Sequence, residues 1–289
     1  MTEKMRKDGV HCSGACGTGI GKQMRMCSIA SGSSGNCIYA GSDTTHILID
    51  TGISKKRTEE GLAGLELSLR DIDGIFITHE HADHIQGLGV ISRKYQIPVY
   101  CTEGTKRAIL SDKRIGDMDE ALFQTVRPDQ KYSVKDMVIT PIRISHDAAE
   151  PTAFKISHGR QRGAVVTDLG VYNDYIVEHL KDLDILYLEA NHDVNMLQVG
   201  PYPYPLKQRI LGERGHLSNE ASGQLLCRIL HDHIKAIVLS HLSKENNLPE
   251  LAYETVRTEV TMSELPYKGG DFPLYVAKRS ELSEVICIS

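Results

Sequence analysis

Long hydrophobic runs are missing from this sequence. No window approaches the roughly 18 apolar residues that a membrane-spanning helix needs. The first 23 residues contain no apolar segment of the kind that directs secretion. We therefore expect a cytoplasmic protein without a membrane partner.

Paired cysteines are also missing. Of the seven cysteines only Cys12 and Cys16 are close together, so the sequence supports neither a disulfide framework nor a zinc ribbon. An excess of basic residues is absent too, because the formal net charge is -5. This charge argues against a protein that coats nucleic acid by bulk electrostatics, although it is compatible with a local basic groove.

The composition is that of a globular enzyme, with 40% hydrophobic and 25% charged residues. Residues 1–25 are rich in glycine and poor in large apolar side chains, so we expect a disordered leader there. No Pro/Gly/Ser-rich linker divides residues 26–289, which predicts a single domain. Short apolar runs in this part alternate with helix-length segments and predict α/β sheets covered by helices. The expected strands are CSIASGSS, HILID, GIFITH, PVYCT, DMVITPIRISH, GAVVTD, ILYLEANH, AIVLSH and PLYVAK.

Six of these runs finish on a polar residue that can bind metal or substrate. They are Asp50, His79, His146, Asp168, the pair Asn191 and His192, and His241. A single histidine after a strand is more often structural than functional. Because the carboxyl ends of strands converge in α/β architectures, six such endings together predict a metal or substrate site.

The stretch THEHADHIQG adds the densest group of candidate ligands, His79, His81, Asp83 and His84. One ion takes about four to six ligands and would struggle to use all of them from one turn, whereas two neighbouring ions can. The stretch is not the HExxH motif of zinc proteases, because its fifth position is Asp83. The lack of cysteine disfavours an iron–sulfur cluster. A mixed His/Asp set is compatible with zinc, manganese or iron.

These motifs resemble the metallo-β-lactamase fold superfamily, whose HxHxDH signature stands here at residues 79–84. The segments ILIDTG, RISHD, VVTDLG and VLSHL follow the order of the other motifs of that family. SIASGSSGNC, NHDVNML, YPYPLKQRILGERGHLSN and SHLSKENNLP look like the YycJ/WalJ branch of bacterial metallohydrolases. The resemblance implies a four-layer αββα sandwich, with two mixed sheets face to face and helices outside. It also implies exonuclease or phosphodiesterase activity on DNA.

The resemblance further implies two divalent metal ions, either Zn²⁺ or Mn²⁺, with iron as another possibility. One ion would be held by His79, His81 and His146. The other would be held by Asp83, His84 and His241. Asp168 would bridge the two ions, and Asp50 would orient the histidine loop (residues 79–84) without binding metal.

Residues outside this set are expected to handle the substrate. His216 is the better candidate for protonating the leaving group and His192 the second, although the ordinary reading of each is a structural histidine. Lys207, Arg209 and Asn219 are expected to contact the substrate. Tyr202 and Tyr204 in the same segment could stack on bases, and the alternative is a solvated loop followed by a helix.

The sequence therefore predicts a two-metal nuclease or phosphodiesterase, exonuclease-like, in which a metal-bridging hydroxide attacks DNA. The alternative is a metal-dependent hydrolase of a small ester, thioester, lactone or cyclic phosphodiester. A non-catalytic scaffold is the least favoured, because every expected ligand position is filled. Nothing in the sequence indicates an oligomeric state.

Overall fold

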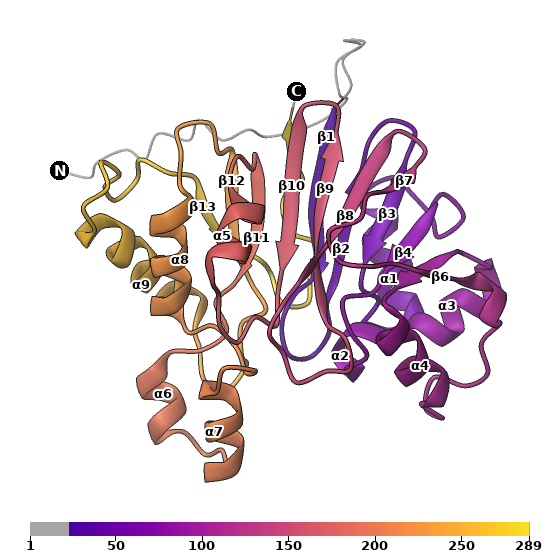
Figure 1. Ribbon diagram of the computed structural model, residues 1–289, viewed down its shortest axis with the longest axis horizontal. Helices are drawn as coiled ribbons and strands as arrows, with labels where there is room; N and C mark the ends of the chain where they lie inside the picture. Colours follow the sequence, from indigo (N-terminus) through magenta and orange to yellow (C-terminus); the bar gives the residue numbers. More distant parts are fainter. Residues whose placement is uncertain (1–22, 289) are drawn as a thin grey trace.

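Two mixed β-sheets lie face to face in the computed structural model, which describes residues 23–288. Helices cover the outer face of each sheet, so the chain forms the four-layer αββα sandwich that the sequence predicts (Figure 1). Side chains from both inner faces form one core layer, which includes Met26, Ile49 and Phe76 from one sheet and Phe154 and Tyr187 from the other.

The first sheet contains seven strands. Its order is β14 (Ile286–Ile288), β1 (Met24–Ala30), β2 (Cys37–Gly41), β3 (His46–Ile49), β4 (Gly74–Phe76), β5 (Val99–Cys101) and β6 (Phe123–Thr125). The pairs from β14 to β3 are antiparallel and those from β3 to β6 are parallel.

The second sheet repeats this arrangement. Its order is β13 (Leu274–Val276), β12 (Ala236–Ser240), β11 (Ile185–Glu189), β10 (Gln161–Val166), β9 (Thr152–His158), β8 (Met137–Arg143) and β7 (Tyr132–Val134). Strands β7 to β10 pair antiparallel and β10 to β13 pair parallel.

The central strands are apolar throughout because both of their faces are buried. In β11, Ile185 and Tyr187 point into the layer between the sheets. Leu186 and Leu188 point to the opposite face, where they pack in the cluster that includes the outer helices. Since side chains alternate across a strand, a strand buried on both faces reads as a continuous apolar run.

The helices divide between the two outer faces. Four lie beside the first sheet: α1 (Lys55–Ala63), α2 (Ala82–Ile85), α3 (Leu88–Tyr95) and α4 (Glu103–Ser111). Three lie beside the second sheet: α5 (Asp174–Leu180), α8 (Asn219–Ile229) and α9 (Pro249–Met262). The remaining pair, α6 (Val194–Val199) and α7 (Tyr204–Leu211), projects from the lower edge in Figure 1. A short 3₁₀ helix, Glu120–Leu122, precedes β6.

Each apolar run expected to be a strand overlaps one in the structure, whereas β2, β6, β7, β9 and β14 were not anticipated. Strand β1 begins at Met24, so Met24 and Arg25 belong to the sheet rather than to the expected leader. The rest of that leader, residues 1–22, lies outside the described residues. Among residues 23–288, no helix has both the length and the apolar character of a membrane span.

Candidate metal centre

The parallel strands bring the polar strand-end residues of both sheets to one edge of the sandwich. Three of these residues, Asp50, Asp168 and His241, have positive φ angles of 62°, 59° and 57°. Such a backbone conformation is unfavourable for non-glycine residues and concentrates at functional sites. The chain therefore bends sharply where β3, β10 and β12 end, and the bends turn these side chains toward one another.

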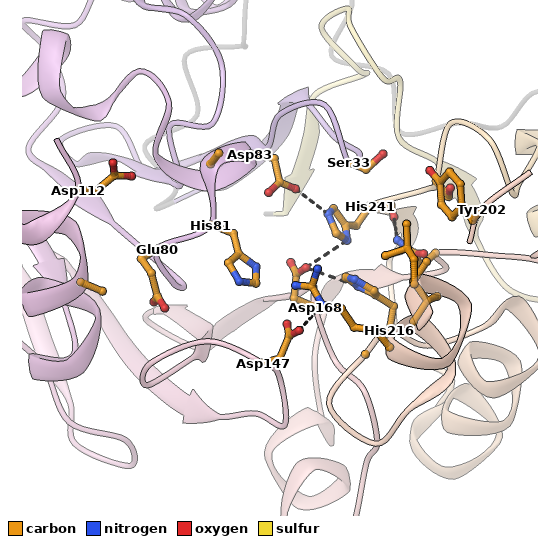
Figure 2. Close-up of a pocket in the computed structure, with 18 of the residues that line it drawn as sticks. Ser33, Glu80, His81, Asp83, Asp112, Asp147, Asp168, Tyr202, His216 and His241 are labelled. Carbon is orange, nitrogen blue, oxygen red and sulfur yellow. Dashed lines mark hydrogen bonds and ion pairs between the residues drawn. The ribbon is translucent and has the colours of Figure 1, made fainter. Parts of the chain in front are cut away.

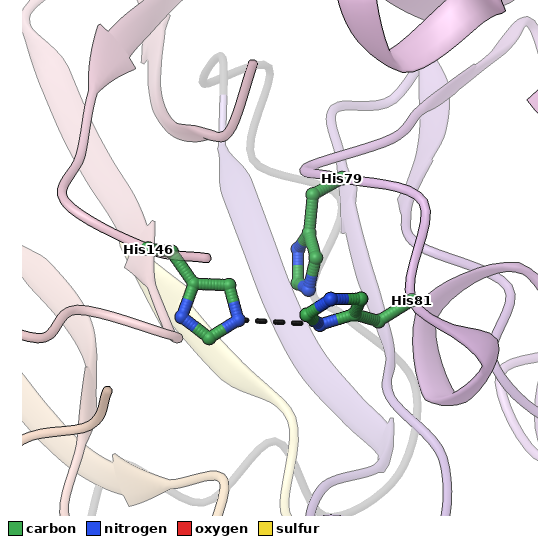
Figure 3. A group of neighbouring side chains, drawn as sticks. All are labelled: His79, His81 and His146. Carbon is green, nitrogen blue, oxygen red and sulfur yellow. Dashed lines mark hydrogen bonds between the residues drawn. The ribbon is translucent and has the colours of Figure 1, made fainter. Parts of the chain in front are cut away.

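His79, His81 and His146 form the first ligand group (Figure 3). Nε2 of His146 lies 3.2 Å from Nδ1 of His81, and the rings of His79 and His81 have their centroids 4.6 Å apart. His79 is fully buried, and its Nε2 has no hydrogen-bond partner within residues 23–288. Burial holds the pKa of His79 well below its usual value. A neutral imidazole with a free nitrogen is the form that binds a metal.

Asp83, His84 and His241 form the second group. Oδ2 of Asp83 lies 3.4 Å from Nε2 of His84 and 3.3 Å from Nε2 of His241. Asp83 and His84 come from the histidine loop, whereas His241 follows β12. Asp83 and His241 are 158 positions apart in the sequence. One nitrogen of each histidine thus faces a shared carboxylate oxygen.

Asp168 lies between the two groups. Its Oδ2 is 3.1 Å from Nε2 of His84, and its Oδ1 is 3.6 Å from Nε2 of His146. His79, His84 and Asp168 also have ligand atoms close enough to share an ion. Asp168 therefore lies close to members of both groups, and its role as a bridging ligand stays a prediction.

Asp50 lies behind His84 and does not line the pocket. Its Oδ2 is 2.8 Å from Nδ1 of His84, so Nε2 of that ring faces the second group. The backbone N–H of Thr78 donates to Oδ1 of Asp50 at 2.8 Å, and its hydroxyl donates to Oδ2 at 2.9 Å. This geometry suits an orienting carboxylate, and that role for Asp50 stays a prediction.

The buried carboxylates give the centre a negative field. Burial lowers the pKa of His241, but Asp168, Asp83 and Glu189 outweigh it and raise the pKa to about 10. The pKa of His84 is likewise held well above its usual value, because Asp168 and neighbouring carboxylates outweigh burial. Such a field favours positive charge, and the donor set of imidazole nitrogens and carboxylate oxygens fits divalent metal ions. The clusters at this edge can therefore bind metal ions.

Glu189 is a member of the centre that the sequence did not reveal. It is fully buried at the end of β11, and its Oε1 lies 2.9 Å from Nδ1 of His216 and 2.8 Å from Nδ1 of His241. Its other oxygen accepts the backbone N–H groups of Leu169 and Leu217. Burial raises the pKa of Glu189, but His216 and His241 outweigh burial and lower the pKa to about 2. The sequence signal that could have found Glu189 is its position within an apolar run. A carboxylate buried there is costly unless partners compensate its charge, so it indicates a polar site.

A pocket of about 590 Å³ opens over the centre (Figure 2). Asp83, Asp168, His81, His216 and His241 lie on its floor and walls. The expected substrate residue Arg209 and the expected stacking residue Tyr202 also line the pocket. Tyr204 does not, and its side chain is exposed.

Two of the expected substrate residues, Asn219 and Lys207, do not line the pocket. Asn219 is fully buried at the start of α8, and its amide exchanges hydrogen bonds of 3.0 and 2.9 Å with the amide of Asn247. The ammonium group of Lys207 donates to the carbonyls of Gln198 and Gly200, both at 2.7 Å, and does not line the pocket. Asn219 thus joins two buried segments, and Lys207 ties α7 to the end of α6.

His192, the second candidate acid, lies behind the pocket wall. Its side chain is 1% exposed, and neither ring nitrogen has a hydrogen-bond partner within residues 23–288. Burial lowers the pKa of His192 to about 4. His216 lines the pocket, whereas His192 does not, so the geometry favours His216 as the residue that meets substrate.

The fold and this centre define a hydrolase of the metallo-β-lactamase type. A family model described as the β-lactamase superfamily domain matches residues 45–242, and the chain belongs to this family. The exodeoxyribonuclease YycJ of Bacillus anthracis is 39% identical over 236 residues, which cover 79% of this chain and 86% of YycJ. The exodeoxyribonuclease WalJ of Streptococcus pneumoniae is 38% identical over 247 residues, covering 86% of this chain and 91% of WalJ.

Solved structures agree with the fold. The metallo-β-lactamase fold protein YhfI from Bacillus subtilis superposes with a TM-score of 0.67 at 16% sequence identity. The superposition covers 91% of this chain and 100% of YhfI. At this low identity the likeness concerns the arrangement of strands and helices, which is the αββα sandwich described above.

Proposed function

We propose that the protein is a two-metal exonuclease that hydrolyses phosphodiester bonds of DNA. The observation that carries the proposal is the pair of ligand groups that share Asp168 beneath an open pocket. The relatives YycJ and WalJ, both described as exodeoxyribonucleases, support DNA as the substrate. A nuclease acting on cellular DNA would work in the cytoplasm, and that location stays a prediction.

In this proposal His79, His81 and His146 hold one divalent ion, and Asp83, His84 and His241 hold the other. Zinc and manganese both suit the donor set, and iron is compatible with it. When bound, such a pair lowers the pKa of water and stabilises the charge that develops on the phosphate oxygens. Asp168 would be the shared ligand, because its two oxygens approach histidines of both groups.

The chain's own groups would protonate the leaving oxygen. Nδ1 of His216 faces Glu189, which leaves Nε2 as the atom available to a substrate in the pocket. Burial lowers the pKa of His216, but Glu189 and Asp168 outweigh it and raise the pKa above the usual value. A protonated His216 beside the cleaved bond can donate to the departing alkoxide.

Arg209 would bind a phosphate of the substrate. It lines the pocket from α7, and its Nε donates to Asp147, the residue that follows His146. That anchor holds the guanidinium over the centre, and a guanidinium matches the geometry of a phosphate. The cavity of about 590 Å³ is of the size that takes a small ligand, which suits the end of a strand.

The same cavity size is compatible with a second candidate function, the hydrolysis of small esters, thioesters, lactones or cyclic phosphodiesters. The bound metals would serve either reaction. Rates on bis-p-nitrophenyl phosphate, a thioester and a lactone separate the two. A clear preference for the thioester or the lactone would favour this candidate over the nuclease.

The direct test combines metal analysis with digestion of end-labelled DNA, single-stranded and double-stranded. Protein loaded with zinc or manganese should shorten the labelled DNA strand progressively from one end. The His81→Ala variant should lose this activity, because it removes a ligand from the pocket floor. The matched control is His233→Ala, whose exposed side chain lies outside the pocket and the ligand groups. Intact DNA under both metals would contradict the proposal.

A further inference from the structure

The pocket over the metal centre has walls from two distant parts of the chain. One wall consists of Ala108 in α4 together with Asp112 and Arg114, which follow that helix. The other is formed by Tyr202 and α7, which contributes Arg209. In Figure 2, Asp112 and Tyr202 lie on opposite sides of the central group of His81, Asp83 and His241. The centre therefore lies in the middle of an extended depression.

Each wall carries one arginine that an aspartate holds in place. On the first wall, Nε of Arg114 donates to Oδ1 of Asp112 at 2.9 Å, and Nη2 donates to Oδ2 at 2.7 Å. This two-bond fork fixes the plane of the guanidinium. On the second wall, Nε of Arg209 donates to Oδ2 of Asp147. The two walls thus present the same kind of group to the pocket.

Arg114 keeps donors for a ligand. A guanidinium has about five N–H donors, and the fork to Asp112 uses Nε and Nη2. The side chain of Arg114 is 74% exposed, while that of Asp112 is only 17% exposed. The remaining N–H donors of Arg114 are therefore exposed to an anion that enters the pocket.

We infer that Arg114 binds a substrate phosphate at the wall formed by the end of α4, separate from the contact that Arg209 would make from α7. The inference rests on the proposed function and deepens it. Two phosphate contacts on separate walls require a strand with several phosphates, one of which can be a terminal phosphate. The substrate class is then an oligonucleotide, because a small ester has no second phosphate for the other arginine. Arg114 is a specificity-determining residue in this arrangement.

Binding measurements test the inference without relying on turnover. A fluorescent phosphorothioate strand of about twelve nucleotides is titrated with the metal-loaded protein at several salt concentrations. Loss of one contact in the Arg114→Gln variant should raise Kd about tenfold, equivalent to about 1.4 kcal/mol. It should also lower the slope of log K against log salt by about 0.7, the value for one phosphate of a single strand. Arg114→Lys keeps the charge and should restore most of the slope.

Arg107→Gln is the matched control. Arg107 lies on α4, its side chain is 75% exposed, and it does not line the pocket. Its substitution removes the same charge at a comparable distance along the chain and should leave Kd and the slope unchanged. Equal effects of Arg114→Gln and Arg107→Gln would show a diffuse charge effect and overturn the inference.

Kinetics on two substrates complete the test. The loss of kcat/KM in Arg114→Gln should be at least about fivefold larger for the oligonucleotide than for bis-p-nitrophenyl phosphate, and should fall mainly on KM. Equal losses on both substrates would overturn the role of Arg114 in spanning the strand. A wild-type protein that binds the strand but cleaves no phosphodiester would instead contradict the proposed function and leave the Arg114 contact standing.

Discussion

Nδ1 of His216 lies 2.9 Å from Oε1 of Glu189 at the buried end of β11. The same oxygen lies 2.8 Å from Nδ1 of His241, a proposed metal ligand. One carboxylate thus orients two rings with different proposed roles, proton donation by His216 and metal binding by His241. A change at Glu189 should therefore affect both functions, whereas a change at His216 should affect only one.

We predict that His216→Ala lowers kcat about 10²- to 10⁴-fold, the usual contribution of a general acid, and leaves the metal content intact. Glu189→Gln should lower kcat as well, and should weaken metal binding about 10- to 100-fold, because His241 loses its orienting partner. Hydrolysis of bis-p-nitrophenyl phosphate and mass spectrometry of bound metal measure the two effects. Glu213→Gln, an exposed neighbour, is the control. Unchanged metal content in Glu189→Gln would refute the dual role.

The two ligand groups make a separate prediction about metal stoichiometry. Wild-type protein should bind two ions per chain. His146→Ala removes a member of the first group only, and should keep one ion held by the second. Asp168→Asn should weaken both, because Asp168 approaches histidines of both groups. Isothermal titration of the metal-free variants with zinc resolves the steps, and a single-step loss of both ions in His146→Ala would contradict separate sites.

The sequence could identify the candidate ligands because His79, His146, Asp168 and His241 each follow an apolar run, and the others cluster just after His79 in THEHADHIQG. Asp168 and His241 are visible as polar residues at the ends of buried runs, and parallel strands bring such ends together. Glu189 escaped notice because it stands inside the run ILYLEA and belongs to the strand. Its partners His216 and His241 are 27 and 52 positions away, so the neighbouring sequence does not reveal the groups that pair with this carboxylate.

A similar cause explains why two of the expected substrate residues, Lys207 and Asn219, lie outside the pocket lining. A sequence gives the charge of Lys207 but not the two carbonyls that take up its ammonium group. It gives the polarity of Asn219 but not the amide of Asn247, 28 positions further on, that pairs with it. Arg209 lines the pocket and pairs with Asp147, which lines it too, and its contact with substrate stays a prediction. Long-range polar pairing decides which polar residues are free to meet a ligand.

Gly52, in the segment ILIDTG, should be essential for the shape of the histidine loop. A Cβ added there would lie 1.6 Å from the carbonyl oxygen of Asp83, a backbone atom that cannot move without displacing the loop. We predict that Gly52→Ala loses metal binding and lowers the melting temperature. Gly270→Ala, where a Cβ meets nothing within 4 Å, should behave as wild type. Normal metal content in Gly52→Ala would show that the loop tolerates the displacement.

Asp136 should stabilise the fold at a point far from the metal centre, where the β7–β8 turn meets the β2–β3 turn of the other sheet. It accepts hydrogen bonds from Ser42 and Thr45, and its Oδ2 lies 3.1 Å from Nε2 of His158. Burial raises the pKa of Asp136, but these contacts outweigh it and lower the pKa from 3.8 to about 2. Because the folded pKa is depressed, the stabilisation is present above pH 3.8 and is lost as the pH falls through about 2. Asp136→Asn should lower the free energy of unfolding at pH 7 by about 1–2 kcal/mol after solvent screening. Urea titrations across this pH range should show that the difference in unfolding free energy between Asp136→Asn and wild type shrinks as the pH falls. The control Asp182→Asn, at an exposed position, should show no such difference. A difference that does not depend on pH would rule out the charge of Asp136 as its source.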